Sequence, residues 1–275
     1  MRFSVRHETR YLYSAPIRLG AHILRLGPRA DGIDLVEREL VIDPVPVLRR
    51  ETTDRFGNTV TEIEFAGESD HLVIDSRFVA ETAPSPAPEL DLQPLPWLVA
   101  PGDPLAAYRD GAALDATVRD FAAKLAAQSG REAPAFLDLL NKSLFTRMDR
   151  RIRASGYAQT PAETLEKGVG ACRDITVLFL AAARSLGLAA RFVSGYQAYA
   201  ETPDGRRHLH AWPEVFLPGY GWRGFDPTHG VAVEDGHVAL CAAPDQLATM
   251  PIEGGFFGDG VTSKLDYAVT IEVEG

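Results

Sequence analysis

Residues 168–187 read GVGACRDITVLFLAAARSLG and carry the strongest local signal in the chain. The stretch opens with a glycine-rich turn and continues after Cys172 as an apolar run from Ile175 to Leu186, which Gly187 ends. An apolar run of this length predicts a buried helix, and glycine is the usual residue just after a helix. The sequence therefore places a cysteine in the first turn of a buried helix.

Helical patterns precede this stretch and strand patterns follow it. Asp103 with Pro104 is a helix-start signal, and the run Thr160–Glu163 is a capping box with proline at the first helical position. The helical patterns cover residues 103–130, 136–148 and 160–168, and the strand patterns cover 190–198, 211–217, 221–225, 231–233, 237–241 and 265–273. Helices followed by antiparallel strands predict an α+β domain.

The first 82 residues have a different, β-type pattern. Apolar and aromatic residues alternate from Phe3 to Tyr13 and again over 21–26, and further strand patterns cover 35–42, 45–47, 59–65 and 71–80. Asp54–Asn58 is a turn signal. Short strands with frequent turns predict an antiparallel, sandwich-like β domain, and no catalytic constellation is visible in it.

Prolines mark the boundary between these halves. Residues 83–104 hold seven of the 19 prolines, which predicts a stiff, extended connector. Its apolar Leu95, Trp97 and Leu98 predict that the connector docks on a domain surface. The expected division is a β domain over 1–82, the connector over 83–104 and a catalytic core over 105–275.

Composition excludes several function classes. The 28 basic and 38 acidic residues give a net charge of −10, which argues against nucleic acid as a partner. No apolar stretch is long enough to span a membrane, and the N-terminus has no apolar signal region, so a cytoplasmic location is expected. No phosphate loop, dinucleotide fingerprint, calcium loop or metal-binding cluster appears, so no cofactor or metal is expected. The sequence carries no signal for the oligomeric state.

One basic cluster stands out within this acidic chain. Arg147, Arg150, Arg151 and Arg153 follow one another at the end of the second helical pattern. A solvated helix C-terminus is the favoured interpretation, and a phosphate or nucleic-acid site is the alternative.

The two cysteines are too few for a disulfide framework or a four-cysteine zinc site. Cys241 lies in an apolar strand pattern and is expected to be a buried structural thiol. Cys172 would meet the free amides and partial positive charge of a helix N-terminus, which favour a thiolate nucleophile. A small buried residue without chemistry is the open alternative at Cys172.

A nucleophilic cysteine needs a base and an orienting group. His210 opens one predicted strand and Asp226 ends the next, so two antiparallel strands would bring them side by side. His208 shares the strand face of His210 and is an alternative base. Asp174, two residues past Cys172, is expected to cap or anchor the turn.

Three ordered motifs now point to a known family. GVGACRD, AARSLGLAARFVSGY and HAWPEVFLPGYGWRGFDPTHG resemble the bacterial transglutaminase-like superfamily, in its putative cysteine protease branch. YLYSAP (11–16), LRLGPR (24–29) and DRFGN (54–58) resemble the N-terminal transglutaminase-associated β domain of that branch. The resemblance covers nearly the whole chain.

The resemblance implies a papain-like core, with a nucleophile helix packed on an antiparallel sheet. It implies Cys172 as nucleophile, His210 as base and Asp226 as orienting acid. Leu209 and His229 depart from the residues common in relatives and bear on the shape of the pocket.

Further site residues are predicted around these three. Trp212 is expected either to line the substrate cleft or to pack in the core, and Tyr196 is expected either to line the cleft or to donate to the oxyanion. The backbone amide of Cys172 is expected to be one oxyanion donor. Gln159 and Tyr157 are the other candidates for the second.

The predicted activity is acyl transfer from a peptide or glutamine amide through a thioester, with hydrolysis favoured over transfer to an amine. Transglutaminase cross-linking is the alternative outcome of the same chemistry. Two other hypotheses are a non-catalytic protein that holds a peptide in the cleft, and an enzyme that works only with a protein partner docked on the β domain.

Overall fold

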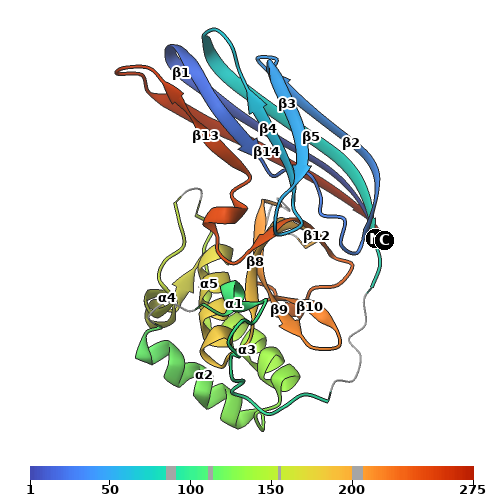
Figure 1. Ribbon diagram of the computed structural model, residues 1–275, viewed down its shortest axis with the longest axis vertical. Helices are drawn as coiled ribbons and strands as arrows, with labels where there is room; N and C mark the ends of the chain where they lie inside the picture. Colours follow the sequence, from blue (N-terminus) through green and yellow to red (C-terminus); the bar gives the residue numbers. More distant parts are fainter. Residues whose placement is uncertain (85–90, 111–113, 154–155, 200–206) are drawn as a thin grey trace.

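The computed structural model describes residues 1–84, 91–110, 114–153, 156–199 and 207–275 (Figure 1). Its two parts are a curled antiparallel sheet and a mixed core of helices and strands. The predicted α+β class with an N-terminal antiparallel β domain is confirmed. None of the described helices has both the length and the apolarity that crossing a membrane requires.

Seven strands form the curled sheet, and β1 is its central member. The first half of β1 pairs with β5 and β14, and its second half pairs with β4 and β13. The strands are β1 (Arg2–Leu24), β2 (Ile33–Asp43), β3 (Leu48–Thr53), β4 (Thr59–Glu64), β5 (Ser69–Thr82), β13 (Ile252–Phe257) and β14 (Ser263–Glu274). Because one long strand serves both halves, the sheet curls around its own apolar cluster.

The two strands predicted within residues 3–26 are in fact one strand. Pro16, between the two predicted segments, lies where the β1–β5 register shifts between Leu12 and Ile17. Proline has no N–H to donate, and the unpaired residue of a bulge does not need to donate one to the neighbouring strand. The strand therefore runs through the proline without losing a ladder bond.

The last strands of the chain belong to the N-terminal sheet, which corrects the predicted core of 105–275. β14 pairs with β1 from Tyr13 opposite Ser263 to Arg2 opposite Glu274, and β13 pairs with the second half of β1. Alternation reveals a strand but not its partner. Only folding shows that the open edge of β1 is filled by the C-terminal end of the chain.

The core consists of helices packed on a five-stranded sheet in the order β11-β10-β9-β8-β12. The strands are β8 (Ala190–Gln197), β9 (His210–Leu217), β10 (Gly221–Asp226), β11 (Val231–Ala232) and β12 (His237–Ala243). The helices are α1 (Ala106–Arg109), α2 (Ala116–Gln128), α3 (Ala133–Arg147), α4 (Pro161–Lys167), α5 (Cys172–Ser185) and the short 3-10 helix η1 (Leu247–Thr249). A two-residue parallel pair, β6 (Asp149–Arg150) and β7 (Val169–Gly170), precedes α5.

The core sheet is covered on both faces. Helix α5 packs against β8 and β9, and the curled sheet packs against β8 and β12 from the other side. Phe3, Phe78 and Ile271 of the curled sheet share one buried cluster with Tyr196 and Leu240 of the core. This is why every residue of β8 is buried.

Two local predictions between the domains are wrong. The helix expected to start at Asp103 is only the four-residue α1, and α2 starts separately where the Asp115 side chain accepts from the Thr117 N–H. In the connector, Leu95 is buried as expected, but Leu98 is 97% exposed. Pro86 and Pro88 lie outside the described residues.

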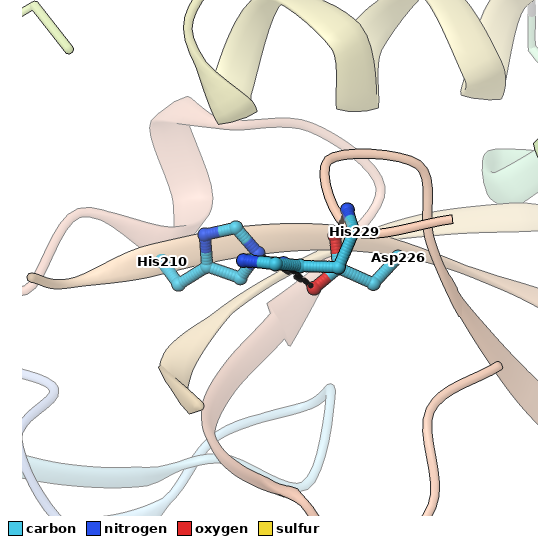
Figure 2. Close-up of side chains that lie close together, drawn as sticks. All are labelled: His210, Asp226 and His229. Atoms are coloured by element: carbon cyan, nitrogen blue, oxygen red, sulfur yellow. Dashed lines mark hydrogen bonds and ion pairs between the residues drawn. The ribbon is translucent and has the colours of Figure 1, made fainter. Parts of the chain in front are cut away.

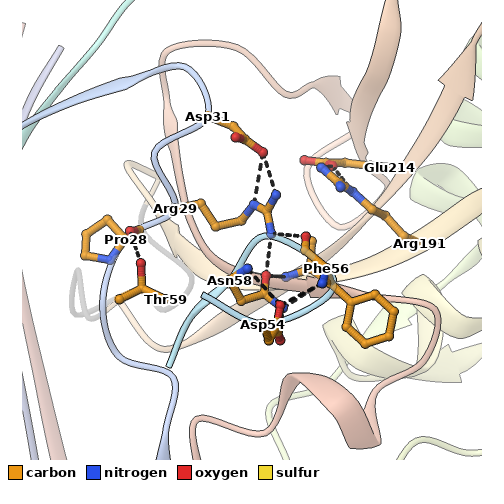
Figure 3. A network of polar contacts seen from close by, with 10 residues as sticks. Pro28, Arg29, Asp31, Asp54, Phe56, Asn58, Thr59, Arg191 and Glu214 are labelled. Carbon is orange, nitrogen blue, oxygen red and sulfur yellow. Dashed lines mark hydrogen bonds and ion pairs between the residues drawn. The ribbon is translucent and has the colours of Figure 1, made fainter. Parts of the chain in front are cut away.

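The motifs around Arg29 and Asp54–Asn58 join the two parts of the molecule (Figure 3). The Arg29 N–H donates to the Ala239 carbonyl at 2.8 Å, and its guanidinium donates to the Asn58 side chain. The Asn58 amide pairs with Ala242 in both directions, at 2.8 and 3.0 Å. Gly57 permits the turn at a φ of 80°. The buried Asn58 side chain therefore pairs with the backbone of β12 as a neighbouring strand would.

Substitution Asn58→Ala is expected to lower the free energy of unfolding by about 2–4 kcal/mol, because it leaves buried donors and acceptors on Ala242 and Arg29 without partners. Urea denaturation followed by circular dichroism measures this. Thr52→Ala, at an exposed position of β3, is the control and should change stability by less than about 0.5 kcal/mol. Equal midpoints for the two variants would contradict the docking role of Asn58.

Candidate active site

A cleft of about 670 Å³ lies between the core and the curled sheet. Cys172 and His210 line it from the core. The opposite wall comes from β1 and β14, through His7, Thr9, Tyr11, Leu265 and Tyr267. The cleft exists only because the two parts of the chain pack together.

Cys172 is the first residue of α5 and is partly buried. The turn before it is fixed by Asp174, whose carboxylate accepts the Ala171 N–H at 2.7 Å and the Gln159 N–H at 2.8 Å. A Cβ at Gly170 would lie 3.0 Å from the Asp174 side chain, so glycine is favoured there. Asp174 anchors the turn, as predicted, and the thiol faces the cleft from a helix N-terminus.

His210 and Asp226 come together from β9 and β10, as the strand pattern predicted. The His210 Nε2–H donates to Asp226 Oδ2 at 2.9 Å, and both side chains are fully buried. Antiparallel pairing of β9 with β10 aligns the start of one strand with the end of the other. Since Nε2 is held by the carboxylate, Nδ1 is the nitrogen that remains for the thiol side.

The electrostatics of this pair favour charge separation. Burial opposes an imidazolium, but the charge and hydrogen bond of Asp226, together with the Cys172 thiol, raise the pKa of His210 well above its ordinary value. Burial also disfavours the carboxylate, yet the His210 charge and the imidazole hydrogen bonds hold the pKa of Asp226 well below its ordinary value. The pair with Asp226 therefore favours the imidazolium form of His210.

Three histidines converge on one oxygen of Asp226. Figure 2 shows two of them, His210 and His229, at the carboxylate. In addition to His210, the His229 Nδ1–H donates to Oδ2 at 2.8 Å and the His237 Nε2–H at 3.0 Å. Oδ1 accepts the backbone N–H groups of Thr228 and His229. Five donors thus hold the carboxylate, and burial lowers the pKa of His237, which favours its neutral form.

His237 is the part of this cluster that sequence reasoning missed. It opens β12, eleven residues after Asp226, and β12 is separated from β10 in the sheet by β9 and β8. A histidine at the start of a predicted strand was the only available signal. By contrast, His229 was noticed because it replaces the residue common in relatives.

His210, Asp226 and His229 are also residue types that bind divalent metals. Their ligand atoms lie within 4.8 Å of one another. Within the described residues, however, each of these imidazole nitrogens donates to Asp226, so a metal would have to replace two hydrogen bonds. The arrangement fits an orienting carboxylate better than an open metal site.

Four side chains predicted for the cleft or the oxyanion lie outside the lining of the cleft: Trp212, Tyr196, Gln159 and Tyr157. Trp212 is buried between His210 and His237, in ring contact with both. The Gln159 backbone N–H donates to the Asp174 carboxylate, and Tyr157 is 65% exposed. Neither is placed as an oxyanion donor. His208 lines the cleft but has no hydrogen bond to Asp226 among the described residues.

Tyr196 lies at the contact between the two domains. Its ring is fully buried beside Phe78, and its hydroxyl shares a 2.7 Å hydrogen bond with His7 Nδ1. Burial lowers the pKa of His7 to about 4, so this histidine is neutral near pH 7. Tyr196 therefore packs at the interface between the domains. It does not line the cleft, where it was predicted to contact the substrate or the oxyanion.

Substitution Tyr196→Phe is expected to lower the free energy of unfolding by about 1–2 kcal/mol, because it removes the buried hydroxyl partner of His7. The rate of a Cys172-dependent reaction per folded molecule should change less than threefold. Thermal unfolding and initial rates on the same preparation measure both quantities. A large fall in kcat at unchanged stability would restore the oxyanion role.

Comparison with known proteins agrees with this architecture. The model of the transglutaminase-like superfamily matches residues 119–227, and the model of the bacterial transglutaminase-like N-terminal region matches residues 3–81. The chain carries a transglutaminase-like core and a bacterial transglutaminase-like N-terminal region. The resemblance expected from the three sequence motifs is thereby confirmed.

Relatives of this transglutaminase-like protein match it over nearly its full length. The uncharacterized protein Rv2569c of Mycobacterium tuberculosis is 26% identical, covering 98% of this chain and 92% of the relative. The uncharacterized protein ML0607 of Mycobacterium leprae is 24% identical, covering 99% and 98%. The crystal structure of a putative cysteine protease from Cytophaga hutchinsonii matches with a TM-score of 0.72 at 17% identity, covering 99% and 90%. At that identity the structural match shows the fold alone.

Proposed function

We propose that this transglutaminase-like protein is a cysteine-dependent acyl-transfer enzyme that acts on peptide or glutamine amides. The observation that carries the proposal is the buried His210–Asp226 hydrogen bond, because His210 lines the same cleft as Cys172. A nucleophile, a base and an orienting carboxylate in this order are the parts that nucleophilic acyl transfer needs.

In the first half-reaction, His210 holds the proton of Cys172 and the thiolate attacks the amide carbonyl carbon. A C–S bond forms, and the carbonyl oxygen becomes an oxyanion. The Cys172 N–H, in the first turn of α5, has no acceptor within the helix and is available to this oxyanion. His210 then protonates the amide nitrogen, the C–N bond breaks, and a thioester and a free amine result.

In the second half-reaction, water or an amine attacks the thioester and gives its proton to His210. The C–S bond breaks, and Cys172 leaves as the thiolate. Hydrolysis is the proposed outcome, because water competes at an open cleft unless a dedicated amine site excludes it. Transfer to a lysine amine is the second outcome of the same steps.

Mass spectrometry of a glutamine-containing peptide library distinguishes the outcomes. The wild type is incubated with and without a primary amine, and Cys172→Ala serves as the blank. Backbone cleavage adds water across a peptide bond, deamidation adds about 1 Da, and amine incorporation adds the mass of the amine less ammonia. The proposal expects cleavage or deamidation that persists when amine is present. Identical spectra for wild type and blank would refute it and favour a non-catalytic peptide-binding role.

A further inference from the structure

The charge of the cleft is opposite to that of the chain. The protein has a net charge of −10, yet the described residues that line the cleft include four arginines and no aspartate or glutamate. The arginines are Arg150, Arg151, Arg153 and Arg173. Three of them come from the basic cluster that the sequence pattern assigned to a solvated helix end. Arg150 and Arg151 are exposed, as that interpretation expected, but all three lie beyond the helix, because α3 ends at Arg147 and the chain then turns into the cleft.

Arg150 is held in a fixed position at the exposed side of the site. Its Nη1–H donates to the Thr228 carbonyl at 2.9 Å, in the turn that follows Asp226, and its guanidinium lies 4.5 Å from the centre of the Phe145 ring. No acidic side chain pairs with it in the described part of the chain. Arg150 is thus a cation positioned in advance next to the strand end that carries Asp226.

Arg151 adds a second cation at the same rim. It pairs with Asp149, but both side chains are more than half exposed, at 69% and 52%. An exposed ion pair contributes little net free energy, so an incoming carboxylate can compete for the guanidinium.

The two inner arginines extend the positive wall to the nucleophile. Arg173 directly follows Cys172 and donates to the Arg153 carbonyl at 2.9 Å. Arg153 itself pairs with the buried Asp174. Burial, followed by repulsion from Arg153, lowers the pKa of Arg173, and the attraction of an anion in the cleft would offset these two effects.

We infer that the cleft takes an acidic peptide, with carboxylate side chains flanking the amide that Cys172 attacks. This inference rests on the proposed function and specifies its substrate class. Arginine suits the purpose because its planar guanidinium binds carboxylates with two parallel hydrogen bonds. The positive cleft in a negative surface would also draw such a peptide to the site and repel it elsewhere.

Binding to the Cys172→Ala variant tests the inference without requiring turnover. Isothermal titration calorimetry would compare three unlabelled octapeptides in which glutamine alternates with glutamate, serine or lysine. The glutamate peptide should bind at least about tenfold more tightly than the serine peptide, and the lysine peptide more weakly than both. Raising NaCl from 50 to 500 mM should reduce this preference several-fold, because salt screens exposed charges.

Charge reversal identifies the residues that carry the preference. Arg150→Glu combined with Arg151→Glu should abolish the preference for glutamate, whereas Arg150→Lys should retain part of it. Arg119→Glu makes the same charge change at an exposed position of α2 outside the lining of the cleft and should keep the full preference. Thermal unfolding checks that each variant is folded, and Arg150→Gln with Arg151→Gln replaces the double reversal if that variant is not.

Three results would overturn the inference. These are equal affinity for the three peptides, an unchanged preference in the double variant, and binding of a single-stranded oligonucleotide of equal charge as tight as that of the glutamate peptide. The wild type separates this failure from failure of the proposed function. Cys172-dependent turnover without acidic preference refutes only the substrate class, and acidic binding without turnover refutes only the enzyme.

Discussion

Substitution Cys172→Ala is expected to reduce turnover of any amide substrate by at least about 10³-fold, because the nucleophile and its thioester are lost together. Folding should be preserved, since the Cys172 side chain is only partly buried and faces the cleft. Initial rates, with unfolding midpoints as the folding check, measure the effect. Residual turnover within tenfold of the wild type would exclude Cys172 as the nucleophile.

Thiol labelling gives the same prediction a second readout. At pH 7, iodoacetamide should modify Cys172 at least about tenfold faster than a free peptide thiol, because a cysteine at a helix N-terminus that shares a cleft with a histidine is a more reactive nucleophile. Cys241 is fully buried, and burial raises its pKa to about 12, so it should stay unmodified. Cys241→Ala is the matched control and should retain both fast labelling and turnover. A rate at Cys172 equal to that of the peptide thiol would contradict the activated cysteine.

Substitution Asp226→Asn is expected to lower kcat/KM by about 10²–10⁴-fold, because it removes the charge that holds His210 protonated and oriented. An asparagine also has one oxygen where the carboxylate has two, so its NH₂ group would face either the imidazole donors or the two backbone donors. The free energy of unfolding should fall by about 2–4 kcal/mol for this reason.

The pH dependence distinguishes orientation from simple loss of stability. The raised pKa of His210 keeps the imidazolium form above the ordinary value of 6.5, so the alkaline limb of the wild-type profile should lie above neutral pH. Without the Asp226 charge, burial dominates and the pKa of His210 falls, which moves that limb to lower pH. His71→Gln changes a histidine outside the cleft and should leave the profile unchanged. If the alkaline limb of Asp226→Asn lies at the same pH as that of the wild type, Asp226 does not raise the pKa of His210.

Stability follows pH through the same pair. The stabilisation linked to the raised pKa of His210 is complete below 6.5 and is lost as pH rises through the folded-state pKa. The stabilisation linked to the depressed pKa of Asp226 is complete above its ordinary value of 3.8 and is lost as pH falls through the folded-state pKa. Wild-type stability from this pair should therefore be greatest between about pH 4 and 6.5 and should decline on both sides.

The local structure of the core was largely predictable from sequence. The glycine turn, the apolar run of α5 and the capping box of α4 are signals within a few residues of one another, and each produced the expected element. The same holds for His210 and Asp226, because consecutive antiparallel strands bring their ends together whatever surrounds them. The failed helix start at Asp103 shows the limit, since Asp115 was equally able to cap a helix.

The surroundings of the site were decided only by the tertiary structure. His237 reaches Asp226 from a strand three places away in the sheet, and β14 returns from the chain end to pair with β1. Contacts of this kind join residues far apart in sequence. The alternation of apolar residues and the strand propensity of a segment do not specify which strand edges meet.

The sequence alone thus determined the fold class and the three residues expected to carry the chemistry, because these depend on local patterns and neighbouring strands. The tertiary structure decided the three-histidine environment of Asp226, the interface position of Tyr196 and the arginine-rich wall of the cleft. The first two arise where a distant strand or the curled sheet packs against the core, and the third where the chain after α3 lies beside the start of α5. The free energy of such packing is a property of the assembled surfaces.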